Sequence, residues 1–358
     1  MSMSTIKIGI IVPMSGTAGI YGPSCSSCIH LAVEKLNKEG GLLGKPIETT
    51  FIDGGQKPNI VADNIKMFVE HGFFDILIGL HDSDVRRAIL ENTTLTIPYI
   101  YTSPYEGNEK NPAMFMIGET PKQQLQDPIP WLIETLNAKK WYLLGNDYCW
   151  PHSLNASARH YINQHSQAEL IGTHYVPFGT EDYSPYIDAM REEKADIVLF
   201  SLVGDDAISF NRQLYDTPDM GHIIRFGPLM EENTLLAIGS TASNEIYAAT
   251  SYHTGLANAQ NTVFLEEYKS AITQNGPMLT SLGESCYEAL IFIKNISVTS
   301  NSLSLDSFAK ASHGLAYNSP RGSVRMEHRH LVQDIHLLKA QDFHFQAVKS
   351  FDQVTPSN

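Results

Sequence analysis

Short apolar runs alternate with longer amphipathic segments along most of the chain. This alternation is typical of parallel β-strands joined by crossover helices, because strands buried on both faces read as nearly continuous Ile/Val/Leu runs. We therefore predict an α/β fold. The predicted strands of the first 250 residues are 6–12, 47–52, 76–79, 99–101, 141–144, 170–175, 197–200, 223–226 and 246–249.

Helical periodicity predicts the segments that cover these strands. In 25–38, apolar side chains recur at three- and four-residue steps from Ile29 to Leu36, and Gly40 ends the segment. Further helices are predicted at 63–71, 205–214, 263–274, 281–296 and 304–312, and late antiparallel strands at 323–326, 334–338 and 343–350.

Nine strands are many for one sheet in a chain of 358 residues. The polar, proline-containing stretch 118–124 predicts a first crossing between two lobes, with further crossings near 251–254 and 326–330. The lobes would be 1–120 plus 252–327 and 121–251 plus 328–358. Three connecting strands would form a hinge that can close on a ligand.

Charge and hydropathy exclude several functions. Lys and Arg number 25 against 39 Asp and Glu, a formal net charge of -14, which argues against direct nucleic-acid binding. No apolar run approaches the ~20 residues of a membrane-spanning helix. The stretch 1–13 lacks a signal-peptide pattern, so we expect a cytoplasmic protein, or a periplasmic one if a leader was trimmed. A homo-oligomer is compatible with the sequence.

The sequence contains none of the common cofactor or catalytic motifs considered next. There is no GxGxxG, GxxxxGK[ST], GxSxG or HExxH motif. The single CxxC pair, Cys25 and Cys28, lies on a helical pattern and is better explained by core packing than by zinc. We therefore predict no cofactor, no metal and no enzymatic activity.

The candidate ligand site is placed by the rule that ligands bind beyond the carboxyl ends of parallel strands. The segments there are rich in hydroxyl groups and aromatic rings, which suit a small neutral polar molecule. The candidate ligand-binding residues are Ser15, His81, Ser83, Tyr101, Ser103, Tyr148, Trp150, Val203, Glu231 and Tyr252.

Several of these candidates also have a simpler interpretation. Tyr148 and Trp150 read as a loop bounded by Pro151, where they could form a buried wedge. Glu231 and Glu232 open a predicted helix, where carboxylates are common without a ligand. Serines after strands are most often helix N-caps, an interpretation that applies to Ser15, Ser83 and Ser103.

Five segments carry a resemblance to a known family. IGIIVPMSG at 8–16 and NKEGGLLGKPI at 37–47 resemble the type I periplasmic-binding fold of branched-chain amino-acid receptors. YTSPYEG at 101–107 and GNDYCWP at 145–151 resemble the subgroup that holds the amide sensor of aliphatic amidase operons and the urea and short-chain amide receptors of ABC importers. The resemblance extends to SPRGSV at 319–324.

The resemblance implies a ligand held between two lobes. Ser83 and Ser103 would donate to its carbonyl, Tyr148 would close over it, and Tyr101 and Trp150 would be walls. Ser103 stands where the amide sensor has threonine. His81 and Trp150 stand where that sensor has tyrosines, which changes the shape of the pocket.

Charge gives an independent hint about the ligand. Asp82 and Asp84 flank Ser83, and Asp147 precedes Tyr148, so a carboxylate would meet repulsion that a neutral amide or urea avoids. The alternative is that these acids face solvent or cap helices.

The leading hypothesis is a non-catalytic receptor that closes around a small amide-, urea- or amino-acid-like solute. As a cytoplasmic sensor it would act on an antiterminator-type regulatory protein, and as an importer receptor on an ABC permease. The rival is an amide hydrolase with Cys149 or Ser83 as nucleophile and His81 or His152 as base. A third alternative is an interaction module whose cleft no longer binds a solute.

Overall fold

A computed structural model describes residues 5–272 and 276–356. The chain divides into two compact units. The first contains residues up to Ser103, Asn108–Gly118 and Leu256–Asp334, and the second contains Pro104–Gly107, Glu119–Gly255 and the chain from Ile335 onward. The boundaries expected from the sequence, after residues 120, 251 and 327, differ from these by two, four and seven residues, and the short segment Pro104–Gly107 was not expected.

The sheet of the first unit is parallel over its first five strands. Their order is β2-β1-β3-β4-β5, and His330 at the start of β13 pairs in parallel with Met116. β11 and β12 extend this sheet as antiparallel strands. The strands are β1 Ile6–Val12, β2 Ile47–Asp53, β3 Ile76–Gly79, β4 Tyr99–Tyr101, β5 Met114–Met116, β11 Ala316–Ser319 and β12 Gly322–Glu327.

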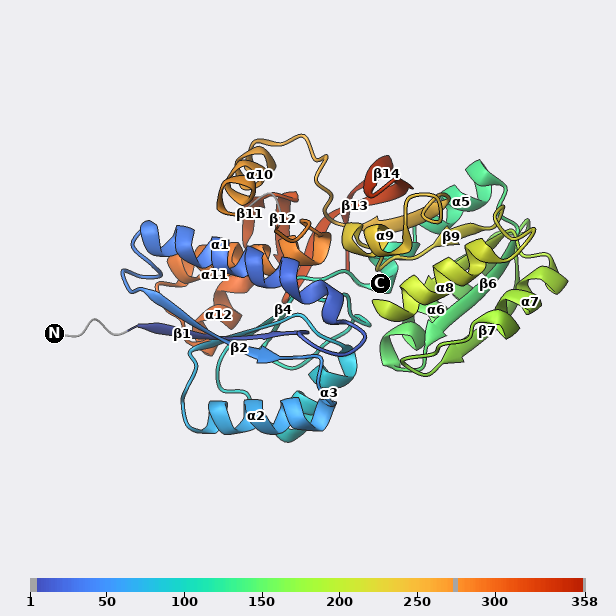
Figure 1. Ribbon diagram of the computed structural model, residues 1–358. Coiled ribbons are helices and arrows are strands. Elements are labelled where there is room, and N and C mark those ends of the chain that lie inside the picture. Colours follow the sequence, from blue (N-terminus) through green and yellow to red (C-terminus); the bar gives the residue numbers. More distant parts are fainter. Residues whose placement is uncertain (1–4, 273–275, 357–358) are drawn as a thin grey trace. The chain divides into compact units, whose positions relative to one another are not determined.

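Helices cover both faces of this sheet. Figure 1 shows α2 and α3 on one side of β1 and β2, and α1 and α11 on the other. Gly40 and Gly41 follow α1 with φ angles of 101° and 78°, so the predicted glycine stop is confirmed. The helices are α1 Gly22–Lys38, α2 Pro58–Glu70, α3 Ser83–Asn92, α10 Ala259–Ala271, α11 Ser281–Ser300 and α12 Leu305–Ser312, with a 3₁₀ turn η1 at Gly19–Tyr21.

The sheet of the second unit has the order β10-β9-β8-β6-β7, again parallel. β13 pairs with β10 in the antiparallel sense, and β14 pairs with β13. The strands are β6 Lys140–Asn146, β7 Glu169–Val176, β8 Ile197–Ser201, β9 Ile224–Phe226, β10 Ile246–Thr250, β13 His330–Gln341 and β14 His344–Val354.

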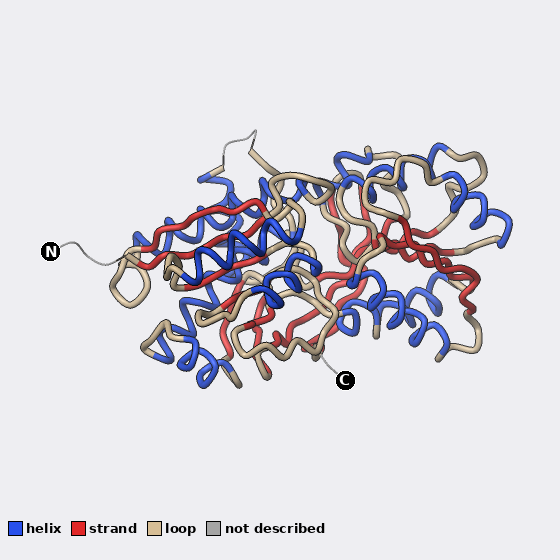
Figure 2. The backbone as a smooth tube through the Cα atoms, turned by 90° about the horizontal axis from the view of Figure 1, so that it is seen from below, coloured by secondary structure: helices blue, strands red, loops and turns tan. Residues whose placement is uncertain are grey.

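The second unit also has helices beside its strands (Figure 2). α8 carries Asp205 and Asp206 in its first turn, where carboxylates complement the positive end of the helix dipole. The helices are α4 Pro121–Leu125, α5 Pro128–Leu136, α6 Cys149–Asn163, α7 Ser184–Glu193, α8 Asp205–Asp216 and α9 Glu232–Ile238.

The predicted α/β class and all nine early strands are confirmed. β5 and β11 were missed, and β13 is longer than the predicted 334–338. The helix predicted at 263–274 ends at Ala271, and residues 273 and 274 lie outside the described part. The sequence was wrong about Tyr148 and Trp150: they lie at the start of α6 rather than in a loop, because Pro151 is tolerated in a first turn.

Cys25 and Cys28 are fully buried on α1, as the packing interpretation predicted. Burial raises the pKa of the Cys28 thiol well above its usual value, with Cys286 and Glu284 adding to the effect. Within residues 5–272 and 276–356, no cluster of three or more metal-ligating side chains occurs. The described helices include none that is long and apolar enough to cross a bilayer.

Candidate functional site

In the first unit, four predicted residues lie at the ends of β3 and β4 or a few residues beyond them. These strands are neighbours that finish side by side, Gly79 being paired with Tyr101. The backbone N–H of His81 donates to the Ser103 hydroxyl over 2.9 Å, and the Tyr101 hydroxyl donates to the His81 carbonyl. Ser83 follows two residues later as the first residue of α3.

The N-cap interpretation of the three serines is wrong. Asp82 occupies the N-cap position of α3, so Ser83 lies inside the helix. Ser103 accepts the bond from His81 instead of capping a helix, and the exposed Ser15 donates to Asp53 at the end of β2 over 2.6 Å. Ser15 therefore lies beyond β1 and β2, at the same edge of the sheet.

The Ser83 hydroxyl is the most informative group of this edge. Its side chain is 2% exposed, and its Oγ has no hydrogen-bond partner in the described residues. Burying a hydroxyl without a partner is costly, so such a group in a native protein needs an explanation. A bound molecule that accepts a hydrogen bond from this hydroxyl is one such explanation.

His81 is held as a neutral ring. Its Nε2 contacts the Tyr99 hydroxyl and its Nδ1 lies 3.0 Å from the Asp82 carbonyl. Burial lowers the pKa of His81 to about 4, the bond to the Asp82 carbonyl opposes this, and Arg86 adds to it. A Cβ on Gly79 would lie 2.8 Å from the ring nitrogen, so only glycine leaves room for the His81–Tyr99 pair.

Two charges shape this edge of the sheet. Burial, and then the carboxylate of Asp84, raise the pKa of Asp82 to about 7. Arg86, which is 4% exposed, lies one turn after Ser83, with its guanidinium 5.0 Å from the centre of the Tyr101 ring and 3.4 Å from Glu109. Sequence reasoning missed Arg86, although its spacing of three from Ser83 put both on one face of a helix.

In the second unit, the other predicted residues lie beyond the ends of neighbouring strands. Tyr148 and Trp150 follow β6, Val203 follows β8, Glu231 follows β9 and Tyr252 follows β10. Their exposed fractions are 7%, 2%, 2%, 3% and 1%. Because carboxyl ends of parallel strands meet at one edge, the five residues share that edge of the sheet.

Tyr148 and Trp150 form an aromatic corner at the start of α6. Their ring centres are 6.4 Å apart, and Tyr148 also lies 5.1 Å from Phe178. The indole Nε1 of Trp150 is buried and has no partner in the part of the chain that the structure describes. Each unit therefore has a buried donor without a partner near a strand end: the Ser83 hydroxyl in the first unit and the Trp150 N–H in the second.

Asn146 organises the loops of this edge and was not predicted to do so. Its side-chain nitrogen donates to Asp206 over 2.7 Å, and its side-chain oxygen accepts from the Val203 N–H over 2.8 Å. Asp206 also accepts from the Gly179 N–H. The amide thus joins the end of β6 to the segment between β8 and α8.

Buried carboxylates in the second unit are a further feature. Glu119 accepts from the N–H and the hydroxyl of Ser251 and from Thr250, so its acceptor Oε1 is well satisfied. Burial raises the pKa of Glu232 to about 7. Glu119 was missed because its partners lie more than 130 residues away.

The residues named for a hydrolase have other partners. The Cys149 thiol donates to the Glu106 carboxylate over 3.4 Å. His152 lies 2.8 Å from Asp147 and stacks on Tyr175. Both nitrogens of His81 are engaged within the first unit.

A cavity of about 400 Å³ lies elsewhere, between α1, α10 and α11. Its walls include Leu36, Tyr287 and Leu290. The two lysines at its rim are paired with carboxylates, Lys35 with Glu267 and Lys294 with Glu39. It shares no residue with the strand-end groups.

Comparison with known proteins agrees with this architecture. The model of the family described as periplasmic binding protein matches residues 5–344. The Leu/Ile/Val-binding protein BraC3 of Rhizobium johnstonii is 22% identical over 251 residues, which are 68% of this chain and 66% of that protein.

Solved structures share the fold over almost the whole chain. A solute-binding protein of an ABC transporter from R. palustris, in complex with 4-hydroxybenzoate, matches with a TM-score of 0.87 and 19% identity over 98% of each chain. The branched-chain amino acid transporter substrate-binding protein of Streptococcus pneumoniae, in complex with isoleucine, matches with a TM-score of 0.82 and 18% identity over 98% of this chain and 100% of that one. The family match over residues 5–344, with which the two α/β units agree, shows that the chain belongs to the periplasmic binding protein family.

Proposed function

We propose that the protein is a non-catalytic solute-binding protein that takes one small polar solute at these strand ends. Ser83 and Ser103 of the first unit and Tyr148 and Trp150 of the second would contact the solute. The observation that carries the proposal is the buried Ser83 hydroxyl, which has no partner in the described residues. A solute that touches both units would favour the conformation in which it can do so.

The donors suggest the chemistry of the solute. Ser103 already accepts a bond from His81, so its own proton is available to donate. Ser83 can donate as well, and the Trp150 indole N–H is donor only. Three donors suit a carbonyl or carboxylate oxygen. We propose a small amide, a urea or an amino-acid-like molecule.

Charge decides between a neutral and an anionic solute. An ionised Asp82 beside Ser83 would repel a carboxylate, as the sequence suggested, whereas the buried guanidinium of Arg86 would attract one. The pKa of Asp82, near 7, makes this balance depend on pH. The solutes named in the two structural matches, 4-hydroxybenzoate and isoleucine, both carry a carboxylate. Both classes therefore enter the test.

The alternative of an amide hydrolase has less support. A nucleophile of this kind needs a base within hydrogen-bond reach. The Ser83 hydroxyl lacks a bond to His81, and the Cys149 thiol donates to Glu106. Binding without turnover accounts for these contacts.

For the partner, we propose an ABC permease, because the similar structures include a solute-binding protein of an ABC transporter and a substrate-binding protein of a branched-chain amino acid transporter. The alternative is a cytoplasmic amide sensor that acts on an antiterminator-type regulator. Copurification with a membrane permease or with a soluble RNA-binding regulator separates these two roles.

The test is calorimetry and thermal unfolding with acetamide, urea, isoleucine and 4-hydroxybenzoate, followed by an assay for released ammonia. We expect at least one of them to bind stoichiometrically without ammonia release and to raise the melting temperature. Ser83→Ala should weaken that binding, whereas Ser312→Ala, whose buried hydroxyl bonds within its own helix, should not. Ammonia release would establish the hydrolase, and no binding by any compound would contradict the proposal.

A further inference from the structure

The first turn of α11 is held tightly against α1. The N-cap Thr280 accepts from the Gly283 N–H over 3.0 Å, and its own N–H donates to Ser24 of α1 over 3.2 Å. A Cβ on Gly283 would collide with the Ser24 hydroxyl, so glycine is what allows this close approach. The start of α11 is therefore fixed in position from one side.

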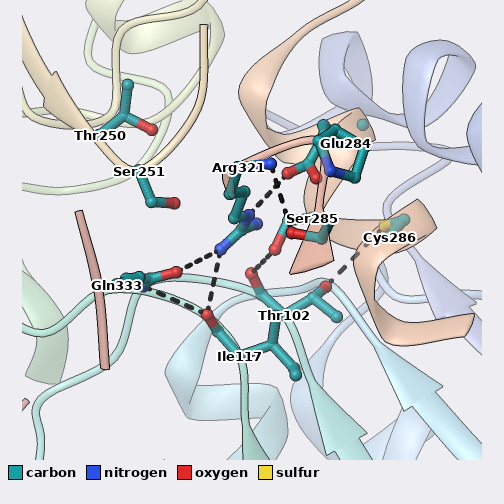
Figure 3. A network of polar contacts seen from close by, with 12 residues as sticks. Thr102, Ile117, Thr250, Ser251, Glu284, Ser285, Cys286, Arg321 and Gln333 are labelled. Atoms are coloured by element: carbon teal, nitrogen blue, oxygen red, sulfur yellow. Dashed lines mark hydrogen bonds and ion pairs between the residues drawn. The ribbon is translucent and has the colours of Figure 1, made fainter. Parts of the chain in front are cut away.

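A buried ion pair fixes α11 from a second side (Figure 3). Glu284 accepts from Arg321 over 2.7 Å, with side-chain exposures of 0% and 1%. Arg321 also donates to Gln333 over 2.7 Å and to the Ile117 carbonyl over 3.3 Å. A buried pair persists only where further hydrogen bonds offset its desolvation. These bonds tie α11, through the turn between β11 and β12 that holds Arg321, to β13 and to the residue after β5.

Ser285 and Cys286, the next two residues of α11, face Thr102 (Figure 3). The Ser285 hydroxyl donates to the Thr102 carbonyl over 2.7 Å, and the Cys286 sulfur lies 3.8 Å from the Thr102 hydroxyl. Thr102 is fully buried, and its N–H donates to the Gly79 carbonyl over 2.8 Å. Thr102 is thus held between the end of β3 and α11.

The Thr102 carbonyl belongs to the peptide plane that also contains the nitrogen and Cα of Ser103. A hydrogen bond that fixes this plane therefore restricts the direction in which the Ser103 side chain leaves the backbone. The Ser103 hydroxyl in turn accepts a hydrogen bond from the N–H of His81. His81 is followed directly by Asp82 and Ser83. One line of contacts thus runs from α11 through Thr102 and Ser103 to His81.

We propose that Ser285 is a positioning residue for the solute site: it holds the Thr102–Ser103 peptide so that the Ser103 hydroxyl is aligned with its partners. This inference rests on the proposed function for its consequence in binding. The geometry of the contact itself does not depend on any solute.

The test compares Ser285→Ala, Ser285→Thr and the control Ser297→Ala. Ser297 is a fully buried serine of the same helix whose hydroxyl bonds a carbonyl of that helix, so its loss removes no contact to Thr102. The first measurement is hydrogen exchange at the His81 amide without solute. We expect Ser285→Ala to speed this exchange roughly tenfold, with threonine restoring protection and the control leaving it unchanged.

The second measurement is affinity for acetamide, urea, isoleucine and 4-hydroxybenzoate. For any of these that the wild type binds, Ser285→Ala should weaken binding by roughly five- to thirtyfold, and Ser285→Thr should retain it. If alanine prevents folding, Ser285→Cys keeps the size and weakens the donor.

The outcomes separate the two proposals. Unchanged exchange at His81 in Ser285→Ala overturns the positioning role. Faster exchange with unchanged affinity shows that Ser103 does not contact the solute, which also overturns it. If the wild type binds none of the four compounds, the proposed function fails while the exchange measurement still decides whether Ser285 orders Ser103.

Discussion

The side-chain amide of Asn146 donates to the carboxylate of Asp206 over 2.7 Å, and both residues are buried in the second unit. The contact links the last residue of β6 to the first turn of α8. Because Asp206 also accepts from the Gly179 N–H, three segments converge on one carboxylate. Desolvation raises the pKa of Asp206 while the bonds from Asn146 and Gly179 lower it, so those bonds favour its charged form.

Replacing Asn146 should therefore destabilise the protein. In Asn146→Ala the Val203 N–H and the Asp206 carboxylate each lose a buried partner, which we expect to lower the free energy of unfolding by about 2–3 kcal/mol. Urea unfolding measures this. Asn295→Ala is the control, because the Asn295 side chain bonds a carbonyl of its own helix. A loss for Asn146→Ala no larger than that of the control would contradict the linking role.

Gly79 is expected to tolerate no side chain. In Gly79→Ala the new methyl group would overlap the Tyr99 ring and approach the His81 nitrogen, so we expect a loss of about 1–3 kcal/mol in unfolding free energy. Adding Tyr99→Phe removes one of the overlapping atoms and should recover part of the loss. A double-mutant cycle by urea unfolding gives the coupling. Strictly additive effects would show that the Tyr99 hydroxyl is not the obstacle.

Local pattern predicted the strands well and the helix starts less well. The run 76–79 is apolar throughout and forms β3 with the predicted ends, since a fully buried strand has a distinct composition. β5, Met114–Met116, was missed, although β4 has the same length of three residues and was predicted. Pro151 suggested a loop, although proline lacks only an N–H that the first helical turn leaves unbonded in any case.

The candidate residues came from one topological rule, that ligands lie beyond the carboxyl ends of parallel strands. The residues that hold them could not be found in the same way. Asn146 bonds Asp206 across 60 positions, and Ser285 bonds Thr102 across 183. Such pairs depend on tertiary packing, and nothing in the local sequence of either partner indicates the other.

Asp82 should make stability depend on pH. Its folded pKa of about 7 lies above the ordinary value of 3.8, so between about pH 4 and 7 the folded protein binds a proton that the unfolded chain has lost. The contribution of this group to stability therefore falls as pH rises through that window. Asp82→Asn should match the wild type near pH 4 and be more stable at pH 8, by about 1–2 kcal/mol because the side chain is only half-buried.

Urea unfolding of both proteins at the two pH values measures this difference, since the other titrating groups are common to both. The control is Asp63→Asn, which replaces an exposed aspartate. The Asp82→Asn variant also tests the charge of the solute. A carboxylate solute should bind this variant more tightly than wild type at pH 8, and a neutral amide should bind both alike. Equal stability of wild type and Asp82→Asn at pH 8 would contradict the burial of an ionised Asp82.

Trp150 offers a test that separates stability from binding. Its indole N–H has no partner among the described residues, so Trp150→Phe removes no hydrogen bond within the protein. Apart from the effect of the smaller ring, we expect the free energy of unfolding to fall by about 1 kcal/mol or less. If the N–H contacts the solute, affinity should fall roughly five- to thirtyfold. Trp141→Phe should behave in the opposite way, because the Trp141 N–H donates to the Ala138 carbonyl over 2.9 Å within the core of the second unit. Calorimetry and urea unfolding of the two variants give the comparison, and a Trp150→Phe variant that binds as well as wild type would remove this donor from the solute site.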